Sequence, residues 1–385
     1  MLVEIHMLHN YAPNNLNRDD TGSPKRCNFG GYPRARVSSQ SLKYAIRKSP
    51  IFQETMKDFG IGIRTRHLPD LVKEKLIERG ISEDFAIEAA QKATGFGNKD
   101  AKETKDYKTK QIMFFSQADI EKVTDVIEKA IKNSKDIADF KKKKAKDLQN
   151  EIKKMGIIPI TADISLFGRM ITSEAFVDKE ASMQVAHAIS TNKIFNEFDF
   201  FTAVDDLQQR GGDMEDQGSA MMGDIEFNSS CFYKYFSFDT EQFIDNFESK
   251  NDSELRNLMV KTIEAFLKAA IFTSPSGKQN TFAAHQLPAV VAVVVRPMKC
   301  PVSFANAFVS PASPYGKKDL EEVSVEKLVN HINTLSKRFN LEATHQFWFE
   351  GRDFNNLEES IPKNFEKKEN IQELVDSLTS VLQGD

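Results

Sequence analysis

Residues 34–50 read RARVSSQSLKYAIRKSP, a stretch that changes from an extended segment to a helix. Residues 34–37 are short and extended, and Ser38 with Ser39 then supplies a helix N-cap. The helix is expected to end near Lys48, because a serine and a proline follow it. This stretch therefore predicts a strand that leads directly into a helix.

The predicted helix has an apolar face and a polar face. Leu42, Ala45 and Ile46 form an apolar stripe that can pack against a core. The polar side chains that fall within one quarter of the circumference are Ser39, Gln40, Lys43 and Arg47. Free N–H groups and the dipole at a helix N-terminus favour phosphate, and two cations one turn apart would share an anion. The pattern predicts a phosphate-binding face, and the simpler alternative is that Lys43 and Arg47 are only solvated.

Positive charge is concentrated near the N-terminus, although the whole chain has a formal net charge of -4. Residues 1–50 contain eight Lys or Arg and three acidic residues, a local balance of +5, so the remaining residues carry -9. Residues 10–31 contain many residues that interrupt helices and strands, which predicts a long loop. This loop contains Arg18, Lys25 and Arg26, and it is followed by Arg34 and Arg36. This asymmetry favours a nucleic-acid partner that the average charge conceals.

Apolar periodicity outlines the rest of the fold. Residues 2–9 alternate as a strand, and residues 60–155 are mostly helical, with a break at Gly80 and a capping box at Ser116 and Asp119. The last helix predicted within this stretch is lysine-rich and covers residues 141–154. The segments that follow are predicted as a strand at 157–171, a helix at 181–191, a projecting loop at 198–224, an aromatic strand at 230–238, a helix at 253–271 and a buried strand at 289–295. Without the insertions, the order is that of split βαβ folds, which predicts an α+β fold of the ferredoxin-like or RRM-like class.

Several protein classes are disfavoured by the sequence. The sequence contains no run of eighteen apolar residues, the length that a membrane-spanning helix needs, and its first residues do not resemble a secretory signal. We therefore expect a cytoplasmic protein. Cys27, Cys231 and Cys300 have no metal-ligand spacing. The loop around Lys278 lacks the first glycine and the Ser or Thr of a P-loop, and other catalytic signatures are absent. We therefore expect no catalytic residue, no metal and no cofactor.

Short motifs occur in a fixed order along the chain. They are residues 17–20 (NRDD), 29–31 (FGG), 36–43 (RVSSQSLK), 163–170 (DISLFGRM), 186–189 (AHAI), 201–208 (FTAVDDLQ), 232–235 (FYKY) and 305–308 (ANAF). Each motif alone is weak, but the ordered set spans most of residues 1–310 and is highly specific. It closely resembles CasC, the family of repeated backbone subunits in the type I-E CRISPR Cascade complex.

The resemblance implies an RRM-like palm of residues 1–59 and 156–385, a helical fingers insertion at 60–155 and a thumb loop at about 196–226. It also implies a non-catalytic protein that binds the CRISPR guide RNA (crRNA), kinks it at regular intervals and leaves the other bases free to pair with target DNA. The implied partners are crRNA, a target DNA strand, further copies of the chain stacked head to tail, and the Cascade subunits CasA, CasB, CasD and CasE, with no membrane.

The same resemblance implies roles for individual residues. The α-helix after Ser38 would hold phosphates, and Met170 would insert beside a displaced base, as apolar wedges do in kinked nucleic acids. A core methionine is the simpler alternative for Met170, and Lys278 would be a secondary contact. The complete set of predicted RNA-binding residues is Arg18, Lys25, Arg34, Arg36, Ser38, Gln40, Lys43, Arg47, Arg169, Met170 and Lys278.

Two other functions remain open. Backbone subunits of type III complexes resemble this family and cut RNA with an aspartate, for which Asp205 and Asp206, with His187 as a base, are the candidates. Adjacent aspartates point to different sides of a strand or helix, which suits capping or solvation better than chelation. A general RRM-type protein would instead stack bases on aromatic side chains, for which Tyr233 and Tyr235 are candidates unless they only pack in the core.

Overall fold

The computed structural model describes residues 1–156, 159–203, 221–247 and 251–384. The chain forms two compact units, one of Met1–Ser49, Val185–Phe238 and Phe266–Val381, and one of Pro50–Gln184, Asp239–Ala265 and the residues after Val381. The mixed α+β class is confirmed. The predicted insertion at 60–155 lies wholly within the second unit, which also contains neighbouring residues that we had assigned to the palm.

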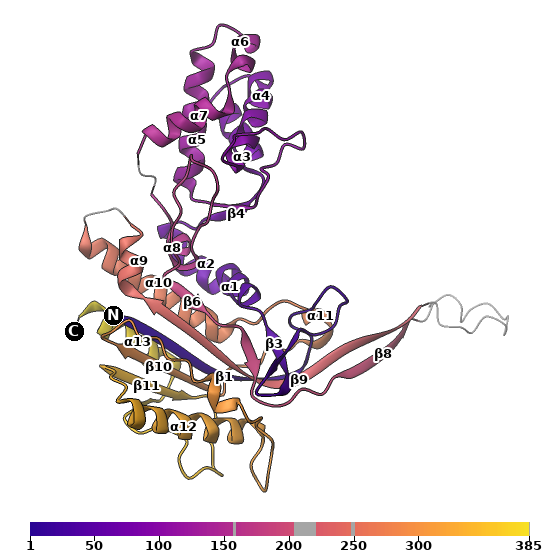
Figure 1. The fold of residues 1–385 in the computed structure, drawn as a ribbon, viewed down its shortest axis with the longest axis vertical. Coiled ribbons are helices and arrows are strands. Elements are labelled where there is room, and N and C mark those ends of the chain that lie inside the picture. The colour runs from indigo at the N-terminus through magenta and orange to yellow at the C-terminus, as the bar shows by residue number, and fades with distance from the viewer. Residues whose placement is uncertain (157–158, 204–220, 248–250, 385) are drawn as a thin grey trace, which may run out of the picture. The chain divides into compact units, whose positions relative to one another are not determined.

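The first unit is built on a large sheet (Figure 1). Its strands are β1 (Leu2–Asn14), β2 (Arg26–Phe29), β3 (Tyr32–Val37), β7 (Ala188–Ser190), β9 (Met221–Asp239), β10 (Val290–Arg296), β11 (His345–Glu350) and β12 (Glu366–Lys368). They lie in the order β12-β11-β10-β1-β9-β7-β3-β2, while β6 (Met183–Val185) and β8 (Glu197–Ala203) pair with β9 off this path. In sequence, α1 (Ser39–Lys48) lies between β1 and β7 and α10 (Asp252–Phe272) between β9 and β10, which matches the predicted split βαβ order.

Strand β1 is central and longer than predicted, because it continues from His9 to Asn14. It pairs antiparallel with β10, from Leu2 opposite Arg296 to Leu8 opposite Val290. Residues 2–9 are buried on both faces. The buried carboxylate of Glu4 is satisfied by the hydroxyl of Tyr235 and the N–H of Val302, each at 2.6 Å.

Helices pack on the sheet of the first unit. Besides α1, they are α11 (Gln279–Phe282), α12 (Leu320–Phe339) and most of α13 (Ile371–Gln383), whereas only the end of α10, from Phe266 onward, belongs to this unit. On one face, Leu328 and Ile332 of α12 pack with Tyr233 and Trp348 of the sheet. Burying side chains of this size contributes roughly 1.5–3 kcal/mol each, so this layer is a principal source of stability for the unit.

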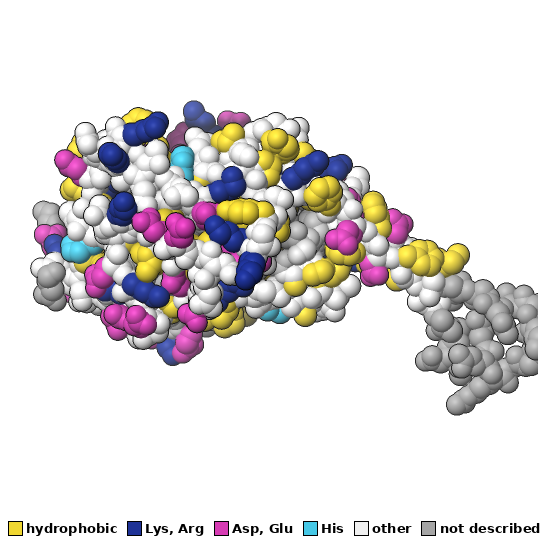
Figure 2. Space-filling view, turned by 90° about the horizontal axis from the view of Figure 1, so that it is seen from below, with side chains coloured by type: hydrophobic (Ala, Val, Ile, Leu, Met, Phe, Trp, Pro, Cys, Tyr) yellow, Lys and Arg dark blue, Asp and Glu magenta, His cyan; other side chains and the backbone are white. Residues whose placement is uncertain are grey.

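The β8–β9 ribbon projects from the sheet (Figure 1). The sequence predicted a loop at 198–224, but residues up to Ala203 form β8 and pair with β9 from Met221 onward. Residues 204–220 of the predicted thumb lie outside the described residues. Hydrophobic side chains gather on this ribbon (Figure 2), where Phe198, Phe200 and Met222 are each about two-thirds exposed.

The second unit contains a helical core. Its elements are α2 (Pro50–Met56), β4 (Ile63–Thr65), α3 (Leu68–Glu78), α4 (Glu83–Thr94), β5 (Met113–Phe115), α5 (Gln117–Lys132), α6 (Ile137–Lys142), α7 (Ala145–Lys154), α8 (Ala162–Phe167) and α9 (Thr240–Asp245). The break at Gly80 and the capping box of Ser116 and Asp119 are confirmed. None of the described helices is both long and apolar enough to cross a membrane.

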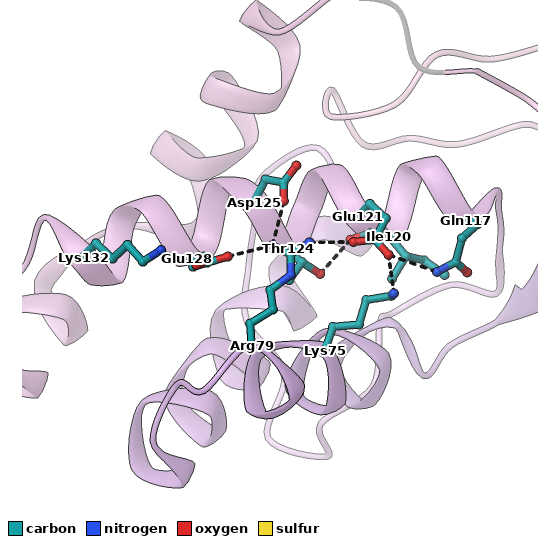
Figure 3. Close-up of polar contacts among 9 residues, drawn as sticks. All are labelled: Lys75, Arg79, Gln117, Ile120, Glu121, Thr124, Asp125, Glu128 and Lys132. Carbon is teal, nitrogen blue, oxygen red and sulfur yellow. Dashed lines mark hydrogen bonds and ion pairs between the residues drawn. The ribbon is translucent and has the colours of Figure 1, made fainter.

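An ion-pair network links α3 to α5 (Figure 3). Arg79 donates to Glu121 at 2.6 Å and to Asp125 and Glu128 at 2.7 Å each. Hydrogen bonds to these three carboxylates raise the pKa of Arg79 above its ordinary value. Lys75 adds a further contact to Glu121. The guanidinium of Arg79 alone contacts three acids of α5, and together with Lys75 it holds α3 against α5.

Three predicted elements differ in the structure. The predicted strand at 157–171 contains helix α8, which ends at Gly168 with a φ of +77°. The predicted helix at 181–191 is instead β6 and β7, because strands β9 and β3 provide hydrogen-bond partners that no local signal reveals. The predicted helix at 141–154 is interrupted by extended backbone at Lys143 and Lys144, which separates α6 from α7.

Candidate nucleic-acid interface

Asn17 connects the segment between β1 and β2, residues 15–25, to the start of α1. We call this segment the basic loop, because it contains Arg18 and Lys25. The side-chain Oδ1 of Asn17 accepts a hydrogen bond from the N–H of Ser38 at 2.9 Å, and its carbonyl accepts from the N–H of Lys25 at 2.8 Å. The carbonyl of Lys25 in turn accepts from the N–H of Arg36 at 2.9 Å. The loop, β3 and the first turn of α1 are therefore held together, which brings Lys25, Arg36 and Ser38 into one region.

Arg18 lies exposed on the same loop. The neighbouring carboxylate of Asp19 accepts from the N–H groups of Thr21 and Ser23, each at 3.0 Å, and residue 18 forms a bridge with Pro24. The segment is therefore an ordered turn, whereas the sequence predicted a long loop over residues 10–31. The ends of that predicted loop belong instead to β1 and β2.

Arg36 meets a histidine that the sequence analysis did not place in the site. Its Nη1 lies 2.9 Å from Nδ1 of His187, whose side chain is exposed just before β7. The pKa of His187 is lowered below its ordinary value. The largest cause is its partial burial, and the positive charges of Arg36 and Lys25 contribute less. The structure therefore brings together Lys25, Arg36 and His187 from three segments of the chain.

Helix α1 begins and ends as predicted, but its polar face is only partly exposed. Ser38 is the N-cap, and its hydroxyl accepts from the N–H of Ser41 at 3.4 Å. Gln40 is exposed and Lys43 is partly exposed. Arg47 is only 5% exposed, so the prediction that it stands on the open polar face is wrong. A charge reversal at Arg47 would perturb the fold and cannot serve as a clean test of RNA binding.

Arg34 has a structural environment that excludes the predicted contact with RNA. Its side chain is fully buried, and Nη1 donates to the carbonyls of Ser190 at 3.1 Å and Thr191 at 2.6 Å. Nη2 donates to the carbonyls of Phe308 at 2.6 Å and Val309 at 3.2 Å. The guanidinium therefore joins the β7 end to residues 308–309, and a phosphate has no access to it.

Lys278 lies on a loop that touches the basic loop after β1. A side chain at Gly277 would come within 2.3 Å of the carbonyl oxygen of Leu16, so only glycine allows this close approach of the two backbones. Lys278 has a φ of +51° and precedes α11. The structure thus places the residue before Lys278 against Asn15 and Leu16, close in sequence to Arg18.

Arg169 and Met170 belong to the second unit and differ sharply in exposure. Arg169 is buried, and its Nη1 lies 2.6 Å from Oδ2 of Asp119, so the predicted RNA contact of Arg169 is wrong. Met170 is 89% exposed, which rules out the core alternative. Ile171 is buried, and its N–H donates to Oδ1 of Asp178 at 2.6 Å. Two anchored neighbours therefore hold Met170 in solvent.

Comparison with known proteins identifies the family. Residues 3–377 match the family described as CT1975-like protein. The chain belongs to the CT1975-like protein family. A chain of a solved "CRISPR RNA-guided surveillance complex, pre-nicking" is similar with a TM-score of 0.81 and 26% identity, over 99% of this chain and 100% of that chain.

A second structure, a "CRISPR RNA-guided surveillance complex", shares the fold of the CT1975-like protein. Its TM-score is 0.70 at 21% identity, over 99% of this chain and 100% of that chain. No curated protein matches the sequence. The two structural similarities extend over both compact units of the CT1975-like chain and include the basic region.

The aromatic-stacking alternative is not supported in this CT1975-like protein. Tyr233 and Tyr235 are 2% and 8% exposed, and their hydroxyl groups bond to His6 and Glu4. Their faces are therefore unavailable to bases. Asp205 and Asp206, the candidates for RNA cleavage, lie outside the described residues. Within the described ranges, no group of three or more His, Cys, Asp and Glu side chains could hold a metal ion.

One residue of the CT1975-like site was missed by sequence reasoning. His187 was considered only as a base for cleavage, because residues 181–191 were predicted to be helical. No local signal could have placed it in the site, because only the long-range pairing of β7 with β3 brings His187 near Arg36.

Proposed function

We propose that this CT1975-like protein is a non-catalytic crRNA-binding backbone subunit of a type I-E CRISPR surveillance complex that acts in antiviral defence. The observation that carries the proposal is the similarity to a chain of a CRISPR RNA-guided surveillance complex at a TM-score of 0.81 over 99% of this chain. Arg18, Lys25 and Arg36 beside the N-terminus of α1 support it, because they offer phosphate contacts without base recognition.

Sequence-independent contacts suit a guide whose sequence varies. Phosphate contacts position a strand, whereas the base edges stay available for pairing. In this proposal, copies of the chain stack head to tail along the crRNA, kink it at regular intervals and present the other bases to target DNA. The other Cascade subunits CasA, CasB, CasD and CasE complete the assembly.

We call Arg18, Lys25 and Arg36 the basic region, and we expect reversal of two of these charges to abolish stable RNA binding. The variant Lys25→Glu with Arg36→Glu should lose about 3 kcal/mol of binding free energy, roughly 100-fold in affinity, from two charge-assisted contacts. The slope of log affinity against log salt should fall by about 1.4, since each phosphate contact to a single strand contributes about 0.7. Fluorescence anisotropy with a labelled guide RNA at several salt concentrations measures both quantities.

The matched control is Lys337→Glu with Arg338→Glu, which makes the same charge change on exposed positions of α12. This control should bind RNA nearly as the unmodified chain does. Equal losses in the two double variants would contradict a specific basic region and indicate a general charge effect.

The proposal that the protein is non-catalytic has its own test. Complexes of the unmodified chain with RNA, incubated with magnesium or manganese, should leave guide and target strands intact. Cleavage of either strand would contradict the non-catalytic proposal.

We further propose that Met170 inserts beside a displaced base of the guide. An apolar side chain that is 89% exposed between two buried neighbours is suited to such a wedge. Met170→Ser should weaken RNA binding by about 1–2 kcal/mol and lower the fluorescence of 2-aminopurine at displaced positions, because base stacking on side chains has this magnitude. Met298→Ser, at another exposed methionine, is the control, and equal signals from both variants would exclude the wedge.

A further inference from the structure

His187 lies where β3 passes into α1. Strands β3 and β7 pair with Val37 opposite Ala188 and Arg36 opposite Ile189. Continuing this antiparallel register by one residue places His187 opposite Ser38, the N-cap of α1. The imidazole therefore contacts the Arg36 guanidinium, and the backbone of His187 lies level with the residue that caps α1. A guanidinium and a helix N-terminus both attract phosphate.

The hydrogen bond fixes the protonation state of the ring. A guanidinium nitrogen can only donate, so Nδ1 of His187, 2.9 Å from Nη1 of Arg36, must be the acceptor. The imidazole is therefore neutral in this arrangement. The charged groups that act on it are Arg36 from β3 and Lys25 from the segment before β2, both positive. In the RNA-free chain, protonation of the ring would add a third positive charge to this cluster.

A bound phosphate would reverse this balance. Its negative charge would compensate Arg36 and Lys25, and its oxygens would accept a hydrogen bond from a protonated ring. Binding of a phosphate and binding of a proton therefore favour each other at this site. Thermodynamic linkage makes the effect reciprocal, so lower pH must strengthen phosphate binding if the phosphate raises the proton affinity of the ring.

We propose that His187 is a proton-dependent member of the phosphate-binding group, so that the chain holds RNA more tightly as the pH falls from about 8 to about 5.5. The proposal rests on the proposed RNA-binding function and adds its regulation by pH.

The direction and limits of the effect follow from linkage. In the RNA-free chain, partial burial and the two cations lower the pKa of His187 below 6.5, and a phosphate raises it in the complex. Affinity therefore rises as the pH falls through the pKa of the complex, and it levels off below that of the free chain. Because one proton is involved, the slope does not exceed about tenfold per pH unit.

The test measures the affinity for a labelled uridine oligonucleotide between about pH 8 and about pH 5.5 at constant ionic strength. The unmodified chain should gain about three- to tenfold in affinity over this range. His187→Gln, whose amide oxygen can still accept from Arg36, should lose this gain. His187→Arg, which carries a permanent charge, should bind with the same affinity throughout. His345→Gln, at another exposed histidine of the same unit, should keep the pH dependence of the unmodified chain.

The outcomes separate the two proposals. A full pH dependence in His187→Gln would overturn the role of His187, even if the chain binds RNA well. A flat affinity in the unmodified chain would overturn it as well. Absence of RNA binding by the unmodified chain at every pH would instead overturn the proposed function. Because His187 is exposed, its variants are expected to fold, and their thermal unfolding curves check this directly.

Discussion

Replacing Asp119 with alanine is expected to lower the free energy of unfolding of the second unit by about 3–5 kcal/mol, because it leaves the buried charge of Arg169 unpaired. The carboxylate has no exposed surface, and its Oδ2 lies 2.6 Å from Nη1 of Arg169. The same oxygen accepts from the N–H of Ser116 at 2.7 Å and completes the capping box of α5. Unfolding in urea, monitored by the circular dichroism signal of the helices, measures this loss of stability.

Two controls test the cause of this loss. Asp125→Ala, on the same helix at a half-exposed position, removes one contact of Arg79 and should cost no more than about 1 kcal/mol. The double variant Asp119→Leu with Arg169→Met removes both buried charges and should be less destabilised than Asp119→Ala alone. If Asp119→Ala costs no more than Asp125→Ala, the buried pair does not have the importance that its burial implies.

Raising the pH from about 7 to about 9.5 is expected to stabilise the first unit through Lys234, by an amount on the order of 3 kcal/mol. Lys234 is 2% exposed, and its amine bonds to Nδ1 of His9 at 2.9 Å and to the hydroxyl of Tyr11 at 3.0 Å, both uncharged partners. Burial lowers the pKa of Lys234 to about 7, whereas in the unfolded chain it is about 10.4. Between these values only the unfolded chain binds the proton, so stability rises with pH.

Lys234→Met should remove this rise in stability. Trp348, the one tryptophan of the sequence, lies in the same unit, so its fluorescence in urea reports the relevant transition. Other groups titrate in the same range, and the difference between the unmodified chain and the variant isolates the contribution of Lys234. Lys48→Met, at an exposed position of α1, is the matched control and should keep the rise. An identical pH profile in Lys234→Met would contradict the prediction, because it would show that the amine stays protonated in the folded chain up to the pKa of the unfolded chain.

Local signals predicted several elements correctly. Ser38 as the N-cap of α1, the break at Gly80 and the capping box at Ser116 act within one helical turn, so the sequence alone contains the information. The apolar run that became β10 was also recognisable, because it is buried on both faces. Residues 181–191 were predicted as a helix, and they are strands because their hydrogen-bond partners in β9 and β3 come from distant parts of the sequence.

Composition and local patterns were enough to predict the fold class, the family resemblance and the concentration of basic residues near the N-terminus. Which of these cations face solvent depends on the packing of the folded chain. Arg34, Arg47 and Arg169 look as suitable for phosphate as Lys25 and Arg36, yet all three are buried. The physical reason is that a long guanidinium side chain can reach carbonyl or carboxylate groups that folding brings near it, as Arg34 and Arg169 do. The same long-range pairing of strands brings His187 to Arg36, which no local pattern could predict.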